Sequence, residues 1–168
     1  YNELGAAAAA YNADEKELCR LDEIYSAVKT PFEIRSGSEK VTRRFFKICN
    51  NGQDSFTGLY KSLTEQGICK GHQCIAYGLY MRDNGIELSE GLAVYGYSIC
   101  SAIVTNCVKL VPLSQLAGQK ILRESFELIS SASEKALFTD INDIGISGAG
   151  FDLRAMQHER LYSRQYMS

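Results

Sequence analysis

A short run near the middle of the chain holds the residues best suited to metal or nucleophile chemistry. It places Cys69, His72 and Cys74 within six residues, and thiolates and imidazoles are ligands that zinc and nickel accept. On a regular helix Cys69 and His72 share one face, but Cys74 lies about 140° away from Cys69. Because one helix cannot direct all three side chains at one ion, the plainer interpretation is two buried apolar thiols and a helix-surface or interface histidine.

Other groups with catalytic potential are sparse. The chain has two histidines, His72 and His158, and it contains no Gly-x-Ser-x-Gly elbow, phosphate-binding glycine loop or His-Glu-x-x-His run. The spacing leaves a Cys–His pair open, but no pattern selects one. Most carboxylates fall on charged helix faces, where solvated ion pairs are expected. These residues favour a helical binding protein over an enzyme.

Composition limits the class of protein further. At 168 residues the chain is about one domain, long enough to bury roughly 70% of its unfolded surface. The 18 Lys and Arg residues are balanced by 20 Asp and Glu residues, so no broad basic surface for nucleic acid or anionic lipid is expected. Six cysteines without a secretory signal sequence predict reduced thiols in a cytoplasmic protein.

The pattern of helix start signals predicts an all-α fold, a single helical-bundle domain with a flexible C-terminal tail. Both prolines stand where helices begin, and Asp14 is placed to cap a helix that reaches Val28. Thr30, Pro31 and Glu33 form a predicted cap, first-position proline and capping-box acid. The basic helix that follows is interpreted as a solvated face. The expected helices span about 1–13, 14–28, 31–49, 55–65, 70–82, 89–108 and 113–137.

Residues 91–108 are predicted to form the central core helix. No charged residue occurs between Glu90 and Lys109, and the large apolar side chains spread around the whole helix, which is typical of a helix buried on all sides. The stretch is long enough for a membrane span. Its tyrosine, serine, threonine and asparagine residues and the lack of flanking basic clusters favour a core helix and no membrane association.

The last third of the chain contains two features that suggest recognition. On the helix expected over residues 113–137, Gln115 lies at the edge of the apolar half, where a buried carboxamide would serve as structural glue or as part of a polar passage. Residues 144–150 are glycine-rich and predict a flexible link, after which helical patterning resumes. We therefore divide the chain into a helical domain, 1–139, and a link with a partner-binding segment, 140–168, that orders on a partner.

Four stretches of sequence resemble the UreF family of urease accessory proteins. They are Val-Pro-Leu-Ser-Gln-x-x-Gly-Gln at 111–119, Met-Gln-His-Glu-Arg-Leu-Tyr-Ser-Arg at 156–164, 29–35 with Arg44-Phe45, and Gly71-His72 with Ala76-Tyr77-Gly78. The close of the chain is most similar to the Helicobacter type. Ser114, Gln165 and residues 41–43 depart from the family pattern. The N-terminal portion with a His-Ser-x-Gly-type motif is missing, so the resemblance implies an N-terminally truncated form.

The resemblance implies a non-catalytic cytoplasmic scaffold for nickel insertion during urease maturation. Such a protein forms a homodimer and bridges the nickel-carrying GTPase UreG to UreD, called UreH in Helicobacter, and apo-urease. It binds no cofactor tightly, because nickel is handled by the complex. An alternative is a nickel- or zinc-binding metallochaperone that uses Cys69, His72 and Cys74. The residues that match the family's partner-binding motif are Met156, His158, Glu159, Tyr162, Ser163, Arg164 and Tyr166. Those that match its internal motifs, including the possible polar passage, are His72, Pro112, Gln115, Gly118 and Gln119.

Overall fold

The structure, a computed structural model, describes residues 2–49, 52, 54–145 and 148–162. Over these residues the chain forms nine α-helices and one short 3-10 helix, with no strand, so the all-α prediction is confirmed. The helices are α1 (Asn2–Asn12), α2 (Glu15–Val28), α3 (Phe32–Ile48), α4 (Phe56–Glu65), α5 (Gln73–Asp83), α6 (Leu88–Leu110), α7 (Gln115–Glu124), α8 (Phe126–Ala136), η1 (Ile141–Asp143) and α9 (Ala149–His158).

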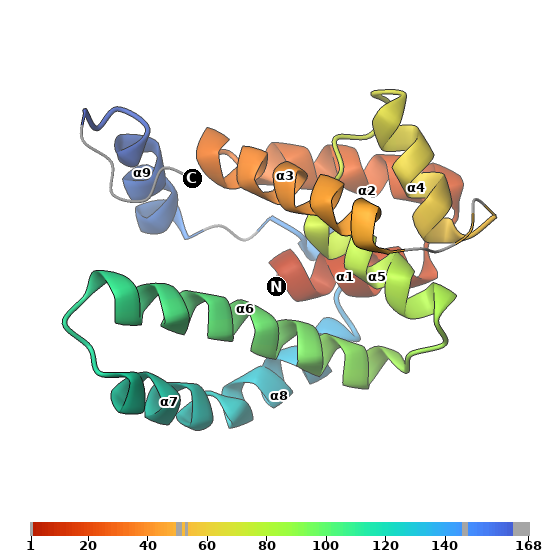
Figure 1. Cartoon of the computed structure of the whole chain (residues 1–168). Coiled ribbons are helices and arrows are strands. Elements are labelled where there is room, and N and C mark those ends of the chain that lie inside the picture. Colours follow the sequence, from red (N-terminus) through yellow and green to blue (C-terminus); the bar gives the residue numbers. More distant parts are fainter. Residues whose placement is uncertain (1, 50–51, 53, 146–147, 163–168) are drawn as a thin grey trace.

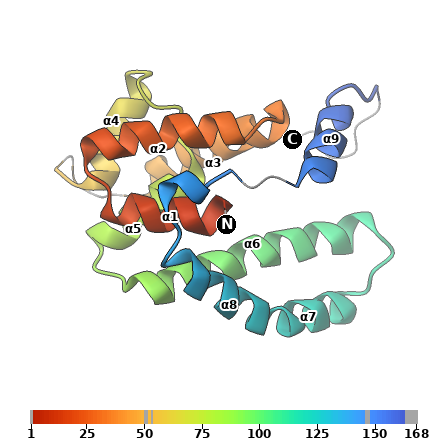
Figure 2. The same cartoon turned by 180° about the vertical axis from the view of Figure 1, so that it is seen from behind.

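The helices pack in layers around α1. Helices α2, α3 and α4 lie on one side of the α1–α5 pair, and α6, α7 and α8 lie on the other (Figure 1). The reverse view shows the same order, with α9 standing at one end of the domain (Figure 2). Because α1 contacts α2, α5, α6, α8 and η1, this helix is the centre of the fold.

Small side chains explain the central position of α1. Its alanines at 6, 7, 8 and 10 are buried, and α5 crosses them closely. A Cβ atom built on Gly78 of α5 would lie 2.2 Å from the carbonyl oxygen of Ala7, a distance that no side chain tolerates. The absence of a side chain at Gly78 therefore sets how near the two helices can approach.

The prediction that residues 91–108 are buried on all sides is wrong. In α6 the buried residues all belong to the N-terminal half, and Ile103 in the C-terminal half is 58% exposed. The physical reason is that α1 and α8 cover only part of this long helix, and α7 covers one side of the rest. An apolar helix is buried all round only when neighbours surround it, and the domain supplies too few of them here.

Helix α6 also has the length and composition of a membrane span. Its mean hydropathy over 18 residues is 1.4, and 22% of that window is buried. The packing of α6 against α1, α7 and α8 is that of a helix within a helical domain, and much of its apolar surface remains uncovered.

The predicted helix starts near Asp14, Ser55 and Pro31 are confirmed, but the cap predicted for the third helix is wrong. Asp14 forms a complete capping box with Glu17 at the start of α2, and Ser55 caps α4. At α3 the helix begins at Phe32 with Pro31 in the cap position and no side-chain cap from the residues before it. Proline supplies no side-chain acceptor, so the box predicted from Thr30 does not form.

Two helix boundaries also differ from prediction. Helix α5 begins at Gln73, so Cys69 and His72 precede it and the helical-face argument for them does not apply. The helix expected over 113–137 is split into α7 and α8 at Ser125. The Ser125 hydroxyl donates to the carbonyl oxygen of Ile121 at 2.9 Å, and such bonding to residue i−4 bends helices.

Candidate functional site

The loop before α5 is held by one buried carboxylate. The oxygens of Asp22 accept hydrogen bonds from the backbone N–H groups of Lys70 at 2.7 Å and Gly71 at 3.0 Å. Asp22 also accepts from the Tyr60 hydroxyl at 2.5 Å, and that hydroxyl accepts from the His72 backbone N–H at 2.8 Å. A buried carboxylate with several donors is well compensated, so Asp22 fixes the conformation of this loop.

His72, the mid-chain histidine of the family motif, ends that loop and is fully buried, so the interpretation as a helix-surface or interface histidine is wrong. Its Nε2 atom lies 2.7 Å from the Ser26 hydroxyl, its Nδ1 atom has no hydrogen-bond partner, and its ring meets the edge of Tyr25 at 5.1 Å between centroids. Burial lowers the pKa of His72 to about 4, although the charge of Asp22 opposes the shift. The imidazole is therefore neutral near pH 7.

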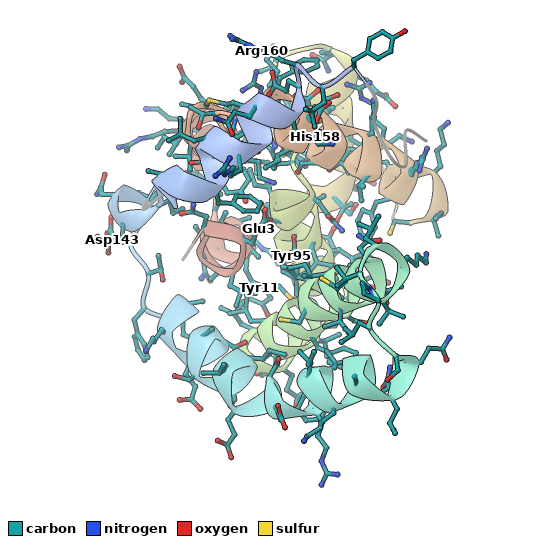
Figure 3. The ribbon with its side chains drawn as sticks, turned by 90° about the vertical axis from the view of Figure 1, so that its left-hand side faces the viewer. Glu3, Tyr11, Tyr95, Asp143, His158 and Arg160 are labelled. Carbon is teal, nitrogen blue, oxygen red and sulfur yellow. The ribbon has the colours of Figure 1, made fainter. Side chains whose placement is uncertain are left out.

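A half-buried polar cluster joins α1, the C-terminal end of α2 and α6. Lys29 Nζ lies 2.8 Å from a Glu3 oxygen, and the Tyr95 hydroxyl donates to the other oxygen of Glu3 at 3.2 Å. Figure 3 shows Glu3 and Tyr95 near each other in the middle of the domain. Burial by itself raises the pKa of Glu3, but the positive charge of Lys29 and its hydrogen bonds bring the pKa below its ordinary value. Glu3 therefore carries a charge that Lys29 balances.

The two thiols of the predicted metal run do not form a ligand set. Cys69 and Cys74 are buried, and burial raises the pKa of both thiols well above the ordinary range. Cys69 Sγ lies 3.9 Å from Cys19 Sγ, on α2. Metal binding requires thiolates, which these sites disfavour. Within the described ranges no three His, Cys, Asp or Glu side chains gather where they could hold a metal ion.

The internal motif at the start of α7 lies on the surface. Ser114 caps the helix, Gly118 is buried, and Pro112, Gln115 and Gln119 are exposed. Gln115 lies three residues from Gly118 at the edge of the same α6–α7 contact, but only Gly118 is covered by α6, so the prediction of a buried carboxamide at Gln115 is wrong. A Cβ at Gly118 would lie 2.7 Å from a methyl of Val108, so glycine is needed for this contact.

Gln115 and Gln119 instead line an open groove between α6 and α7. The groove has a volume of about 330 Å³ and is also bordered by Thr105 and Lys109. His72 is not among the residues that line it, so the structure does not bring the two family motifs together in one site.

The predicted partner-binding residues divide into three groups. Met156 and Tyr162 are exposed, whereas His158 and Glu159 contact the start of α3. Ser163, Arg164 and Tyr166 lie outside the described residues.

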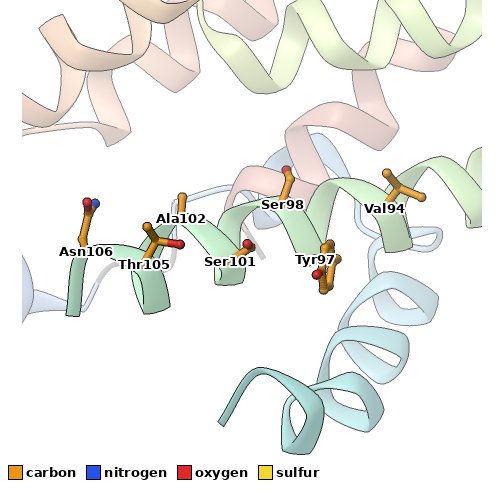
Figure 4. Close-up of a pocket in the computed structure, with 7 residues that line it drawn as sticks. All are labelled: Val94, Tyr97, Ser98, Ser101, Ala102, Thr105 and Asn106. Carbon is orange, nitrogen blue, oxygen red and sulfur yellow. The ribbon is translucent and has the colours of Figure 1, made fainter. Parts of the chain in front are cut away.

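The uncovered face of α6 forms a further open groove of about 520 Å³. It is lined by uncharged residues that follow one another along the helix (Figure 4). They are Val94, Tyr97, Ser98, Ser101, Ala102, Thr105 and Asn106.

The structure adds polar residues that the sequence reading missed. Asp22 and Glu3 were not predicted, and Lys29 was noted only as part of the 29–35 stretch, although Asp22 lies in the same helical stripe as Leu18 and Tyr25. Its position in that apolar stripe is the one sequence signal that could have indicated burial, and a buried carboxylate needs hydrogen-bond partners. No comparable pattern marks Glu3, whose partner is 26 residues away in sequence.

The fold and the distribution of apolar and polar side chains together indicate the class of protein. Within the described ranges Asp22 and the Glu3–Lys29 pair are held by contacts inside the fold, whereas large apolar side chains are exposed on α6, α7, α8 and α9. Exposed apolar surface of this kind is typical of a protein that binds other proteins. The described part of the chain has the features of an all-α binding protein.

Comparison with known proteins identifies the family. The sequence model of the UreF family matches residues 1–126. The chain is 34% identical over 158 residues to the urease accessory protein UreF of Actinobacillus pleuropneumoniae serotype 5b, covering 94% of this chain and 70% of the relative. It is 35% identical to UreF of Haemophilus influenzae, covering 90% of this chain and 65% of the relative. It is 31% identical to UreF of Paenarthrobacter aurescens, covering 88% of this chain and 67% of the relative. The chain belongs to the UreF family, as the sequence motifs predicted.

Proposed function

We propose that this chain is a urease accessory scaffold that acts during urease maturation. In this role it bridges the nickel-carrying GTPase UreG and the UreD/UreH–apo-urease assembly, and nickel is the cargo of that assembly. Family membership supports the accessory role. The chain spans about two thirds of the length of these relatives, so the partners are part of the proposal.

The observation that carries the scaffold proposal is the exposed apolar surface of α9. Phe151 is 70% exposed and Leu153 is 60% exposed, and no residue of this helix is buried. A ten-residue helix is marginal in water without packing, so a partner that covers these side chains would stabilise it. Leu153 and Met156 are three residues apart and share one exposed face of α9, a spacing that fits the helix-in-groove mode of protein recognition.

Deletion of residues 151–168 tests this proposal. Because the core residues of α1, α2 and α5 lie outside that segment, the truncated chain should keep its helical circular dichroism signal and its cooperative unfolding. It should lose its complex with UreD/UreH or UreG on size-exclusion chromatography. Unchanged complex formation would count decisively against a partner-binding role for the segment.

Homodimer formation belongs to the same proposal, and the α6 groove is the surface to test first. This face carries no charge between Glu90 and Lys109, so two copies can approach without charge repulsion. An Ala102→Glu substitution places two like charges close together if this face pairs with itself. Sedimentation equilibrium should then show a loss of dimer, and an unaltered dimer would reject this face.

The polar-passage role of Gln115 is the last part of the proposal. The exposed carboxamides of Gln115 and Gln119 border the α6–α7 groove, where they could contact a hydrated cation or its carrier. A Gln115→Leu variant should fold and form its complexes but support less urease activation. Full urease activation by the Gln115→Leu variant would refute a role of Gln115 in nickel passage.

A further inference from the structure

The C-terminal helix touches the domain at the start of α3. The Phe32 backbone N–H donates to a Glu159 carboxylate oxygen at 2.8 Å, and His158 Nδ1 lies 2.6 Å from a Glu33 carboxylate oxygen. These pairs join residues that are 127 and 125 positions apart in the sequence. Figure 3 shows His158 on the side of α9 that faces α3.

Glu159 takes the place of the missing cap of α3. The first N–H groups of a helix have no partner within the helix, and an oxygen acceptor from the cap residue usually satisfies one of them. Pro31 holds the cap position of α3 and supplies no side-chain acceptor. The carboxylate of Glu159 supplies it from a distant part of the chain, and its negative charge also suits the positive end of the helix dipole.

The same turn is connected to the half-buried Glu3–Lys29 ion pair. Arg35 of α3 donates to the carbonyl oxygens of Lys29 at 2.8 Å and Thr30 at 3.2 Å. The side chain of Lys29 then reaches inward to Glu3 at 2.8 Å. The turn between α2 and α3 therefore contacts α9 on the outside and the Glu3–Lys29 ion pair on the inside.

We propose that α9 and the α2–α3 turn form a two-state latch. In the closed state, which the structure shows, Glu159 caps α3 and His158 pairs with Glu33. In the open state α9 leaves the turn, its apolar side chains become available to a partner on every side, and the first turn of α3 loses its cap. The coupling free energy is the same in both directions. A partner that binds the open state better therefore favours loss of the α3 cap, and a change that loosens the start of α3 increases the affinity for that partner by the same factor.

The closed state is a property of this chain alone. The open state rests on the proposed function, in which the C-terminal segment binds a partner. A measurement on the isolated chain therefore tests the latch, and complex formation by the truncated chain tests the proposed function, so failure of one is distinguishable from failure of the other.

Amide hydrogen exchange measured by mass spectrometry provides this test. A Glu159→Ala variant should exchange about fivefold faster than wild type in two segments, α9 and the first turn of α3, since one capping interaction of ordinary strength is lost. Glu159→Gln keeps an acceptor oxygen without the charge and should fall between the two. Peptides from α5, which packs mainly against α1 and α4, should exchange at the wild-type rate.

Glu127→Ala is the matched control. Glu127 is an exposed acid in the first turn of α8, far in the fold from α3, and its removal should leave α9 and α3 unchanged. Wild-type exchange of both segments in Glu159→Ala would overturn the latch. Faster exchange of α9 without any change at the start of α3 would overturn the coupling between them, and equally faster exchange of α5 would show general destabilisation instead of a latch.

Discussion

Neutral, buried His72 should make the folded chain sensitive to mild acid. Its pKa is lowered from 6.5 to about 4 by burial, so the folded state resists a proton that the unfolded state accepts. Between these two pKa values the unfolded chain binds more protons, and folding stability therefore falls as the pH drops from 6.5 toward 4. Above about pH 7.5 His72 is almost entirely neutral in both states and contributes little pH dependence.

The size of the effect follows from the same two values. A group with a pKa of about 4 when folded and 6.5 when unfolded removes about 2 kcal/mol of unfolding free energy between about pH 7.5 and about pH 5. Glu3 affects stability at lower pH. Its pKa is lowered in the folded state, so the stability that its charge contributes is lost only as the pH falls below the ordinary carboxyl pKa. The window between about pH 5 and about pH 6.5 therefore reports mainly on histidine.

Urea unfolding at a series of pH values measures this effect, and the chain offers a matched control. It has two histidines, so His72→Gln removes the buried imidazole and His158→Gln removes the exposed one. The His72→Gln variant is expected to lose the steep fall in stability, and His158→Gln should retain the contribution of His72. Parallel pH profiles for wild type and His72→Gln would refute a neutral His72 in the folded state.

Three further predictions follow from packing and burial. Gly78→Ala should lower the unfolding free energy by about 3 kcal/mol, because the new Cβ would meet the backbone of α1. Gly37→Ala, whose Cβ would meet nothing within 4 Å, should raise the unfolding free energy by about 0.5 to 1 kcal/mol. Urea titrations compare the two variants, and equal effects would reject the close α1–α5 crossing. Asp22→Asn should cost about 3 kcal/mol in the same assay, because an amide NH₂ would face N–H donors, and a neutral result would show that the loop does not depend on the carboxylate. Under native conditions iodoacetamide should modify exposed Cys107 well before buried Cys74, as peptide mass spectrometry would show, and the reverse order would contradict the burial of Cys74.

Local sequence signals were enough to locate most of the helices. The Asp14 box, the Ser55 cap and the turn at Gly67, where the backbone takes a positive φ of 76°, act within a few residues, so each can be recognised from the sequence alone. The family motifs were recognisable for the same reason, since they are runs of consecutive residues. The start of α3 shows the limit, because its acceptor comes from Glu159 and no local pattern indicates that.

Which apolar helix lies at the centre was decided only by the tertiary structure. The composition of residues 91–108 predicts burial, but burial depends on how many neighbours surround a helix. The alanine-rich α1 takes the centre because small side chains let α5 pack closely against it, and α6 is left partly uncovered.

The sequence by itself determined the helical class, the family and most helix ends of this protein, since these depend on residue type and short spacing. Tertiary structure decided that His72 is buried and neutral, that Gln115 is exposed beside a groove, and that α9 caps α3. Each of these properties depends on side chains brought together from distant positions, and a carboxylate, an imidazole or an amide takes its charge state and role from those neighbours.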